Sequence, residues 1–457
     1  MRSKICFFDD YFIASRQGTL RRYFRPEKIG ELDDKGYQFQ LYSSFFYDKK
    51  VGKYRAYYEV PSPNFNDLEI RDVRLAEADT PEDFVKGNFT SQFINGFKNG
   101  SHGICVIYNP DDDIYVLVGD SDFTNPDPIH PNSHGCALLS CMTSKDGINF
   151  SDERIICNVH SDTYNCICYN PYTKEYVVTM RAVWGDRRVW YIKSKDLYTW
   201  TEPELLMFPY ANDNSGMQYY ALGISHCDGI FYGILWKYMT DLNKPDFTDM
   251  AGYMDNDLMY SIDGIHYNPT PLAPVCERPL PPEAGCKQMW LQKVEESNDG
   301  RTLIFGAAAR VMHGADIDES KDDKMAVSVL YGIRKDGFCA IEGVTGSSEI
   351  YTKNLNIKGE EIYLNFNARC GKITYALVDD LGREIEGFAF ADCVAFENEE
   401  SVSKKLEWKN PDWNKVKNRR VRIALRFPGS LVYSISLDCG LWTMWPQEGI
   451  NLPIKQK

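Results

Sequence analysis

A short turn motif recurs five times along the chain, and this repeat limits the possible folds more than any other feature. Its clearest copies, at residues 144–150 and 261–267, read Ser-x-Asp-Gly and end on an aromatic residue. The Asp side chain accepts N–H bonds in a tight turn, and Gly adopts the positive φ that the turn needs. The central residues stand 50 to 73 positions apart: Asp79, Asp146, Asp196, Asp263 and Asp336. A four-stranded blade with its loops has about this length, so the motif counts blades and carries no chemistry.

A pair of short, apolar, strand-like runs precedes each copy of the motif. Residues 166–170 and 175–181 form one such pair, and segments with helical periodicity are nearly absent from the chain. Five hairpins and five turns predict an all-β fold that begins with a five-bladed β-propeller over residues 1–343. Beyond that point, strictly alternating strands without the motif predict a C-terminal β-sandwich over residues 344–457.

The composition narrows the range of partners and compartments. A net charge of -14 and a pI near 5.1 disfavour nucleic acid and anionic membrane surfaces as partners. No apolar run reaches the roughly 18 residues of a membrane span, and Asp9 and Asp10 interrupt the stretch that a signal peptide would need. We therefore interpret the first residues as a strand. The 14 cysteines lack zinc-site spacing and suit reduced, buried thiols, which predicts a cytoplasmic protein. Assembly into a homo-oligomer through the sandwich is compatible with the sequence.

Three segments carry a resemblance to a known family. They read Cys-Phe-Phe-Asp-Asp-Tyr-Phe-Ile at 6–13, Ser-Asp-Thr-Tyr-Asn at 161–165 and Val-Asp-Asp-Leu-Gly-Arg-Glu-Ile at 378–385. There the chain resembles a bacterial family of five-bladed β-propellers with a C-terminal β-sandwich, similar to glycoside hydrolase families 32 and 43. The resemblance implies this fold and hydrolysis of a glycosidic bond. The three-carboxylate pattern of those families is not matched, because Ser43 or Ser44 and His102 stand where acidic residues are expected.

The residues that open each inner strand of a propeller converge on its axis, so polar side chains there are candidates for a site. Glycoside hydrolysis needs an acid to protonate the leaving oxygen and a carboxylate to act as nucleophile or to activate water. Asp162 is the first candidate carboxylate, although a turn-capping Asp is the alternative. Glu283 is the candidate second acid or else a solvated loop residue. Asp9 and Asp10 face opposite sides of a strand, so at most one of them reaches the axis. Asp10 is the catalytic candidate of the two, and the alternative is ring closure by this first strand.

Ten further side chains are candidates for binding the substrate. Arg181 and Arg188 present fixed donor forks for hydroxyls or a carboxylate, but they suit salt bridges between blades equally well. Trp290 could stack on a sugar ring or fill the core. The whole predicted set is Asp9, His102, Asn165, Arg181, Arg188, Tyr219, Gln288, Trp290, Arg310 and His313.

No cofactor is firmly implied. Histidines from several blades, His134 and His160 among them, could bind a divalent metal in the funnel, but no local spacing rule tests this.

These observations favour a glycoside hydrolase that acts on a short oligosaccharide or glycoside by carboxylate general acid/base chemistry. The chain shows neither a Gly-rich phosphate loop nor a Ser elbow for acyl transfer. Two alternatives stay open: a metal-dependent carbohydrate hydrolase such as a deacetylase, and a sugar-binding propeller without catalysis. A cytoplasmic enzyme would meet short imported oligosaccharides, which favours action at chain ends.

Overall fold

A computed structural model describes most of the chain, and its described residues are almost entirely β-strand. They are residues 3–33, 42–61, 71–96, 100–125, 136–159, 161–182, 187–211, 213–214, 216–240, 252–313 and 326–452. Within these ranges one short α-helix occurs, α1 (Pro81–Val85), which begins at a capping box formed by Thr80 and Asp83. The predicted all-β class is confirmed.

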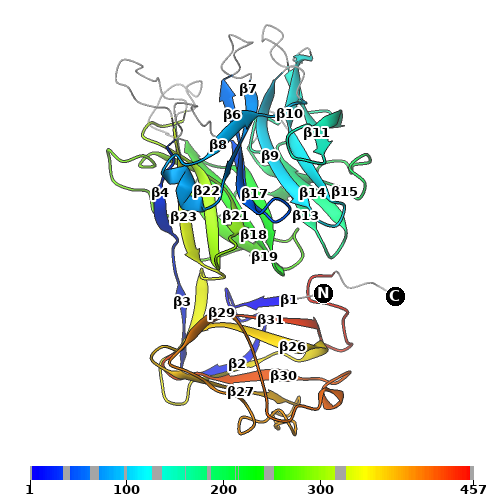
Figure 1. Ribbon diagram of the computed structural model, residues 1–457, viewed down its shortest axis with the longest axis vertical. Coiled ribbons are helices and arrows are strands. Elements are labelled where there is room, and N and C mark those ends of the chain that lie inside the picture. Colours follow the sequence, from blue (N-terminus) through cyan, green and yellow to red (C-terminus); the bar gives the residue numbers. More distant parts are fainter. Residues whose placement is uncertain are drawn as a thin grey trace.

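Twenty strands form five groups of four in the upper part of Figure 1. Blades I and II share one sheet, in which Arg71 pairs with Ser101 across the blades. Blade I holds β5 (Ser43–Asp48), β6 (Lys53–Pro61), β7 (Arg71–Ala78) and β8 (Thr90–Phe93). Blade II holds β9 (Ser101–Asn109), β10 (Ile114–Asn125), β11 (Cys136–Ser144) and β12 (Ser151–Cys157).

The other three blades follow the same plan, with antiparallel neighbours throughout each blade. Blade III holds β13 (Cys166–Asn170), β14 (Glu175–Met180), β15 (Val189–Ser194) and β16 (Glu204–Met207). Blade IV holds β17 (Met217–Cys227), β18 (Ile230–Thr240), β19 (Gly252–Ser261) and β20 (Asn268–Pro269). Blade V holds β21 (Gln288–Glu296), β22 (Arg301–Ala309), β23 (Val327–Arg334) and, from the other end of the chain, β4 (Glu27–Glu31).

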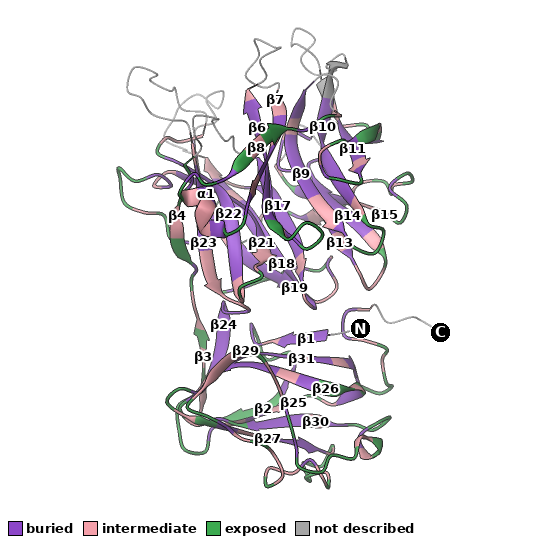
Figure 2. Cartoon of the chain, viewed as in Figure 1, coloured by how far each residue is buried: buried purple, intermediate pink, exposed green. Residues whose placement is uncertain are grey.

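The first strands of the groups form a ring. They contact one another in the order β5, β9, β13, β17, β21 and back to β5, which makes them the inner strands of a β-propeller. Most of their residues are buried and none is exposed, and Figure 2 accordingly shows β9, β17 and β21 largely in purple. Because β4 comes from an early part of the chain and completes blade V, the ring is closed by strand pairing rather than by a loop.

Two further sheets pack as a sandwich below the propeller (Figure 1). One contains β1 (Ser3–Cys6), β3 (Thr19–Tyr23), β24 (Cys339–Gly343), β26 (Leu355–Asn367), β29 (Glu400–Lys405) and β31 (Leu431–Leu441). The other contains β2 (Ile13–Gln17), β25 (Glu349–Thr352), β27 (Lys372–Val378), β28 (Phe396–Glu397) and β30 (Arg422–Arg426).

The first three strands of the chain belong to this sandwich, which differs from the predicted propeller range of residues 1–343. Ser3 pairs with Leu437, and the fully buried Ile5 pairs with Ile435. The physical reason is that β1 has a partner strand in β31, so it does not serve as an inner propeller strand. The interpretation of the first residues as a strand agrees with the structure, whereas the range of the propeller begins later than predicted.

The repeated Asp turns join the third and fourth strands of blades I to IV. In blade II, Asp146 accepts the N–H groups of Ile148 and Asn149 at 2.8 Å each. Burial works against ionisation there, but these hydrogen bonds hold the pKa of Asp146 well below its usual range.

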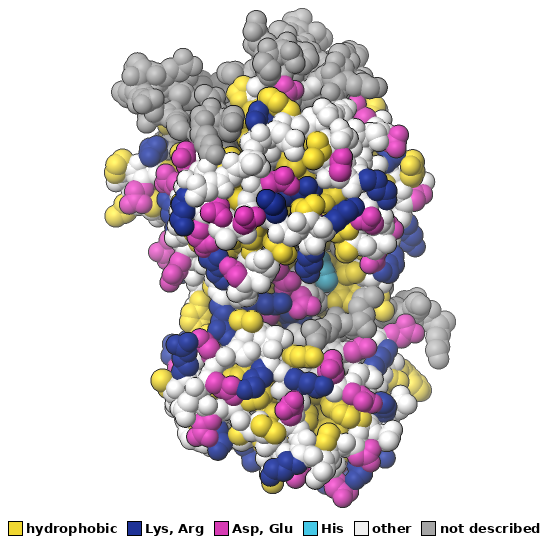
Figure 3. Space-filling model, in the orientation of Figure 1, with side chains coloured by type: hydrophobic (Ala, Val, Ile, Leu, Met, Phe, Trp, Pro, Cys, Tyr) yellow, Lys and Arg dark blue, Asp and Glu magenta, His cyan; other side chains and the backbone are white. Residues whose placement is uncertain are grey.

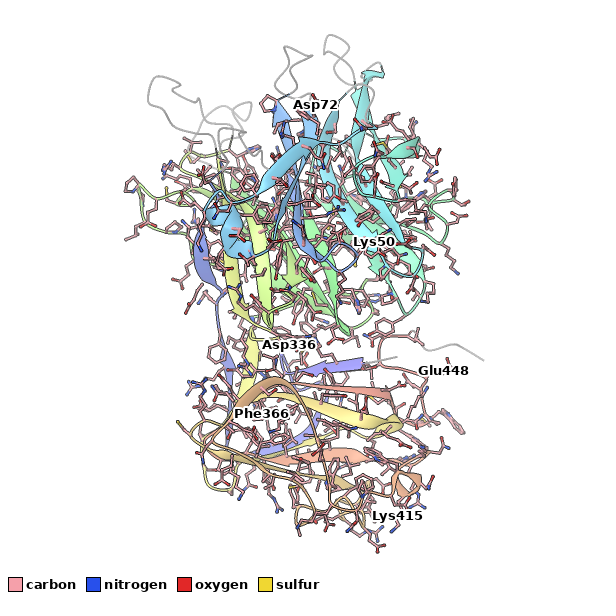
Figure 4. The ribbon with its side chains drawn as sticks, in the orientation of Figure 1. Lys50, Asp72, Asp336, Phe366, Lys415 and Glu448 are labelled. Atoms are coloured by element: carbon pink, nitrogen blue, oxygen red, sulfur yellow. The ribbon has the colours of Figure 1, made fainter. Side chains whose placement is uncertain are left out.

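The fifth turn differs, because its chain leaves the propeller for β24 of the sandwich. Asp336 is buried there, between the two units (Figure 4), and bonds Lys4 at 2.9 Å and Ser434 at 2.7 Å.

The inner strands run toward the sandwich. The turn after β17 contacts β1, since the carbonyl oxygen of Cys227 accepts a bond from Lys4 at 3.3 Å. The inner strands therefore begin at the opposite end of the propeller, where Asp72 near the start of β7 also lies (Figure 4). This is the end at which the sequence predicts the funnel.

The described surface and thiols add two observations. On the face shown in Figure 3, Lys and Arg side chains are interspersed with Asp and Glu over both units. The cysteines whose side chains are described are all free thiols, and most of them are buried.

The described part of the chain holds no helix with the length and apolarity that crossing a membrane would take.

Candidate functional site

Asp162 lies just before β13, at the funnel end of the third inner strand, in an uncommon backbone conformation. Its φ is 44°, in the left-handed region that Asp adopts more readily than most residues. The carboxylate of Asp120, on β10 of the neighbouring blade, accepts the N–H of Asp162 at 2.8 Å and that of Ser161 at 3.3 Å. Asp120 is fully buried, whereas the Asp162 side chain is 33% exposed. This loop therefore presents one carboxylate at the surface of the funnel.

Two cationic donors flank that carboxylate. His102, at the start of β9, places Nε2 3.5 Å from Oδ1 of Asp162. Arg181, which follows β14, places Nη1 3.5 Å from Oδ2 and donates from Nη2 to the Asp162 carbonyl oxygen at 2.8 Å. Positive charge on both sides favours the ionised carboxylate by Coulomb attraction. The structure thus brings together Asp162, His102 and Arg181, all three of which the sequence predicts.

His102 is itself set to carry a proton. Burial lowers the pKa of His102, but bonding to Asp162 and the negative charges of Glu59 and Asp120 outweigh it and raise the pKa above the ordinary value. The raised pKa favours an imidazolium beside the Asp162 carboxylate.

Glu59 is a carboxyl group that the sequence analysis did not select. It lies near the end of β6, its side chain is fully buried, and its Oε1 accepts the N–H of Ile104 at 3.3 Å. Burial raises the pKa of Glu59 to about 7, although the charges of His102 and Arg71 work in the other direction. A carboxyl group that titrates near neutral pH beside a histidine is a feature typical of functional sites.

Stacked aromatic rings pack beside these charged groups. The rings of Tyr42 and Tyr164 stack on the buried Trp236 at centroid distances of 6.1 and 5.6 Å. Tyr42 also meets His102 edge to face at 4.9 Å. Burial raises the pKa of the Tyr42 phenol, and the nearby Tyr220 and Asp162 add to the effect. All three stacked rings are at most 5% exposed, so they pack beside the charged groups as part of the apolar core.

Further aromatic rings of the cluster contact guanidinium groups. The Arg181 guanidinium lies 4.9 Å and that of Arg187 5.3 Å from the centre of the Tyr220 ring. His313 meets the Tyr220 and Tyr238 rings edge to face at 5.6 and 5.5 Å. Burial lowers the pKa of His313 to about 4, helped by the charge of Arg187, so this imidazole is neutral. The prediction placed His313 in the site, but Tyr220, Tyr238 and Arg187 were missed.

Two predicted amide side chains are also buried near the inner-strand starts. The N–H of Asn165 donates to the Gly103 carbonyl oxygen at 3.0 Å, and a Cβ at Gly103 would lie 1.9 Å from the Thr163 oxygen. Blades II and III therefore approach closely here only because residue 103 is a glycine. Gln288 donates to the Val311 carbonyl oxygen at 2.6 Å. The side-chain oxygens of both amides are buried without a hydrogen-bond partner among the described residues.

Four predicted binding residues lie elsewhere. Trp290 is buried in the apolar core, and Tyr219 donates from its hydroxyl group to Asp213 at 2.8 Å. Arg188 is exposed, with its guanidinium 5.8 Å from the Phe208 ring, and Arg310 is exposed and donates to the Pro282 carbonyl oxygen at 2.8 Å. The structure shows no contact between these four side chains and Asp162 within the described ranges.

The predicted carboxylates Glu283, Asp9 and Asp10 are not brought to Asp162. Glu283 is exposed in a turn, and its charge acts on Tyr331 of β23. Asp9 accepts the hydroxyl of Tyr260, and Asp10 pairs with Arg21, both at the junction with the sandwich. Because β1 pairs in the sandwich, its following turn lies at the end of the propeller opposite the funnel.

The histidine positions give no metal centre within the described residues. Among them, no group of three or more His, Cys, Asp or Glu side chains is arranged to hold an ion. His134 and His160, named from the sequence, lie outside the described residues.

A cleft of about 560 Å³ lies away from this cluster, beside blade V and the sandwich. Its walls include Arg301 and Arg334, and these charges are paired: Arg301 with Glu82 at 2.7 Å and Arg334 with Glu400 at 3.2 Å. The chemistry of the funnel is more distinctive, because there the titratable groups come from different blades and converge.

The missed residues left only faint signals. Glu59 is the one acid in the run Tyr57-Tyr58-Glu59-Val60. A carboxyl group within an apolar strand is rare, and it indicates a candidate functional residue. The sequence predicts Tyr219 at the funnel, whereas the structure has Tyr220 there. A bulge between Tyr219 and Ala221 changes which side chain faces the axis. The bulge itself has no evident sequence signal.

No protein-family model and no curated protein matches the chain. Among solved structures, an exo-β-1,3-galactanase from Phanerochaete chrysosporium is 10% identical, covers 92% of this chain and 100% of its own, and gives a TM-score of 0.42. A GH32 β-fructofuranosidase from Bombyx mori is 12% identical, with 94% and 95% covered and a TM-score of 0.40. An N-acetylgalactosamine deacetylase from F. plautii is 10% identical, with 69% and 95% covered and a TM-score of 0.44. These similar structures differ in activity, so the function of this chain is argued from its own residues.

Proposed function

We propose that this protein is a glycoside hydrolase that acts on a short oligosaccharide or glycoside, built on a five-bladed propeller with a β-sandwich. One observation carries the proposal: the partly exposed carboxylate of Asp162 is held at the funnel between His102 and Arg181. Glycoside hydrolysis depends on an ionised carboxylate at the reacting carbon, as nucleophile or as base for water.

The contacts of Asp162 suit that role. Its main chain is fixed by Asp120 and Arg181, so the carboxylate is oriented before substrate arrives. Preorganisation of this kind lowers the barrier because little reorientation is needed in the transition state. The buried ring of Tyr42 packs edge to face against His102 and helps to fix its imidazole.

The role of His102 differs from that of the second catalytic carboxyl group of a glycosidase. The two carboxyl groups of a glycosidase stand about 5–10 Å apart, with the substrate between them. His102 contacts Asp162 directly at 3.5 Å. It therefore acts on the charge and orientation of Asp162 rather than across the bond that is cleaved.

A substrate panel tests the proposal. Aryl glycosides and short oligosaccharides are incubated with the wild-type protein and with Asp162→Asn, each with and without a chelator. We expect hydrolysis of at least one substrate by wild type, insensitive to the chelator. In Asp162→Asn we expect kcat to fall roughly 10³-fold or more, the scale of losing a catalytic group.

The matched control is Asp10→Asn, which removes a carboxylate at the junction with the sandwich and should leave kcat within about twofold, since its partner there is Arg21. Near-normal turnover by Asp162→Asn would refute the assignment. Activity that disappears with the chelator would support a metal-dependent carbohydrate hydrolase instead.

A cytoplasmic location and a homo-oligomer formed through the sandwich are further proposals. Free thiols at the described cysteines suit a reducing compartment. The first is tested by fractionating the source cells and the second by light scattering of the purified protein.

A further inference from the structure

We propose that Glu59 is a positioning residue that acts through His102, holding its imidazole as a cation beside Asp162. The three side chains come from three successive blades, and the charges of Glu59 and Asp162 both act on the His102 imidazole. The inference rests on the proposed function for its effect on turnover, but not for the charge relationship itself.

The position of Glu59 is fixed by its strand. Tyr58 pairs with Ser43 at the start of the inner strand β5, so Glu59 lies one residue further toward the funnel. One carboxyl oxygen accepts the Ile104 N–H, which joins blade I to the segment that follows His102. The other oxygen, Oε2, is buried and has no hydrogen-bond partner among the described residues. A buried acid with an unused oxygen has a cost that a fold without function would not need to retain.

His102 has the complementary feature. Its Nε2 faces Asp162, while its Nδ1 is buried and has no hydrogen-bond partner among the described residues. In histidines that act with a carboxylate, the second ring nitrogen is the one that sets tautomer and orientation. Glu59 is the buried carboxyl group of blade I whose charge acts on this ring.

The charged and titratable groups around His102 come from five segments. They are Tyr42 before β5, Glu59 on β6, Arg71 at the start of β7, Asp120 on β10 and Asp162 before β13. The three carboxyl groups favour protonation of His102, and the charge of Arg71 acts on Glu59. Asp120 is already engaged by the N–H groups of residues 161 and 162, and Asp162 faces the funnel. Glu59 is therefore the group that can set the charge of His102 without taking part in binding.

The consequence is a defined pH dependence. As pH rises through the pKa of His102, the cation beside Asp162 is lost and turnover falls. Removing the charge of Glu59 makes the imidazolium less favourable, so the same loss occurs at lower pH. Because Glu59 and His102 interact, their titrations are coupled and the apparent midpoint belongs to the pair.

The decisive experiment is an NMR titration of His102 in protein labelled with ¹³C at histidine, which has 7 such residues. His102→Gln identifies the resonance by its absence. In Glu59→Gln, which keeps the shape and an acceptor for Ile104, we expect the midpoint to fall by about one pH unit, a tenfold fall in the ratio of imidazolium to imidazole at a given pH. The alkaline limb of the kcat/KM profile should move by the same amount.

Glu77→Gln on β7 of the same blade is the matched control, since Glu77 pairs with Arg55 away from the funnel, and it should leave the His102 midpoint unchanged. An unchanged midpoint in Glu59→Gln, or an equal change in both variants, would overturn the inference. A changed midpoint in a protein that hydrolyses no glycoside would keep the inference and reject the proposed function.

If Glu59→Gln does not fold, the reciprocal measurement decides. In glutamate-labelled His102→Gln, the carboxyl group that titrates near neutral pH should have its midpoint raised, because the imidazolium that lowers it is gone. A midpoint equal to that of wild type would overturn the inference.

Discussion

Asp120 uses both of its carboxylate oxygens to hold the main chain at Asp162, accepting the Asp162 N–H at 2.8 Å and the preceding N–H at 3.3 Å. The two residues lie on adjacent blades, so the position of the candidate catalytic carboxylate depends on how blades II and III are packed. Asp120 pairs with His102 in the β9–β10 ladder, beside a register shift. One buried carboxylate therefore connects both halves of the site.

Replacing this acceptor should misplace the candidate catalytic carboxylate. In Asp120→Asn the amide NH₂ cannot accept a hydrogen bond, so one of the two buried N–H groups loses its partner, at a cost of about 1–3 kcal/mol. We expect kcat to fall roughly 10²-fold, the scale of an ångström-sized displacement, with a smaller change in KM. Steady-state kinetics on whichever glycoside the wild type cleaves, together with circular dichroism, measure the effect. Unchanged kcat in a folded Asp120→Asn protein would show that the loop is positioned by other bonds.

The blade architecture was predictable because its turn motif is held by local physics. In the copies at Asp146, Asp196 and Asp263 the Asp accepts N–H groups two and three residues ahead, as Asp196 does with Tyr198 and Thr199. Such bonds depend on neighbouring residues only, so they leave a pattern in the sequence. The pairing of Ser3 with Leu437 depends on two segments at opposite ends of the chain, and no local pattern records it. That is why residues 3–23 were predicted in the propeller and lie in the sandwich.

The site was predictable only where a polar residue opens an inner strand. Asp162 and His102 satisfy that rule and converge. Glu59 lies on a second strand and reaches the site because the β5–β6 register places it beyond Ser43, which sequence alone does not fix. Tyr220 replaces Tyr219 at the funnel because one bulged residue reverses the faces of a strand.

Acid should destabilise the fold through a partly buried histidine on β17. Burial and the nearby Lys4 lower the pKa of His226 to about 4, and its Nε2 accepts the Gly229 N–H at 3.2 Å, which requires a neutral ring. The folded pKa lies below the unfolded value of about 6.5. The contribution is therefore complete above pH 6.5 and is lost as pH falls toward 4, on the order of 1–3 kcal/mol.

Urea unfolding at pH 7.5, 6 and 4.5 measures this loss in wild type and in His226→Gln, whose side-chain oxygen can still accept the Gly229 N–H. We expect the free energy of unfolding to decline less steeply with falling pH in the variant. Parallel pH dependences for the two proteins would assign the acid sensitivity to other groups.

Replacing Lys4 should lower the stability of the protein and make the propeller and the sandwich unfold at different temperatures. The Lys4 ammonium group is fully buried and lies 2.9 Å from the buried Asp336, while its more distant partners Glu296 and Asp228 are partly exposed and also pair with Lys335 at 3.3 and 3.2 Å. Lys4→Met leaves the buried Asp336 carboxylate without its ion-pair partner, and we expect the free energy of unfolding to fall by about 3–5 kcal/mol. The control Lys417→Met breaks an exposed pair with Glu360 and should cost less than about 1 kcal/mol.

Because β1 joins the sandwich to the turn after β17, the Lys4→Met substitution should also separate the unfolding of the sandwich from that of the propeller. Calorimetry would then show two transitions in Lys4→Met, and a single transition at the wild-type midpoint would contradict this account of the junction.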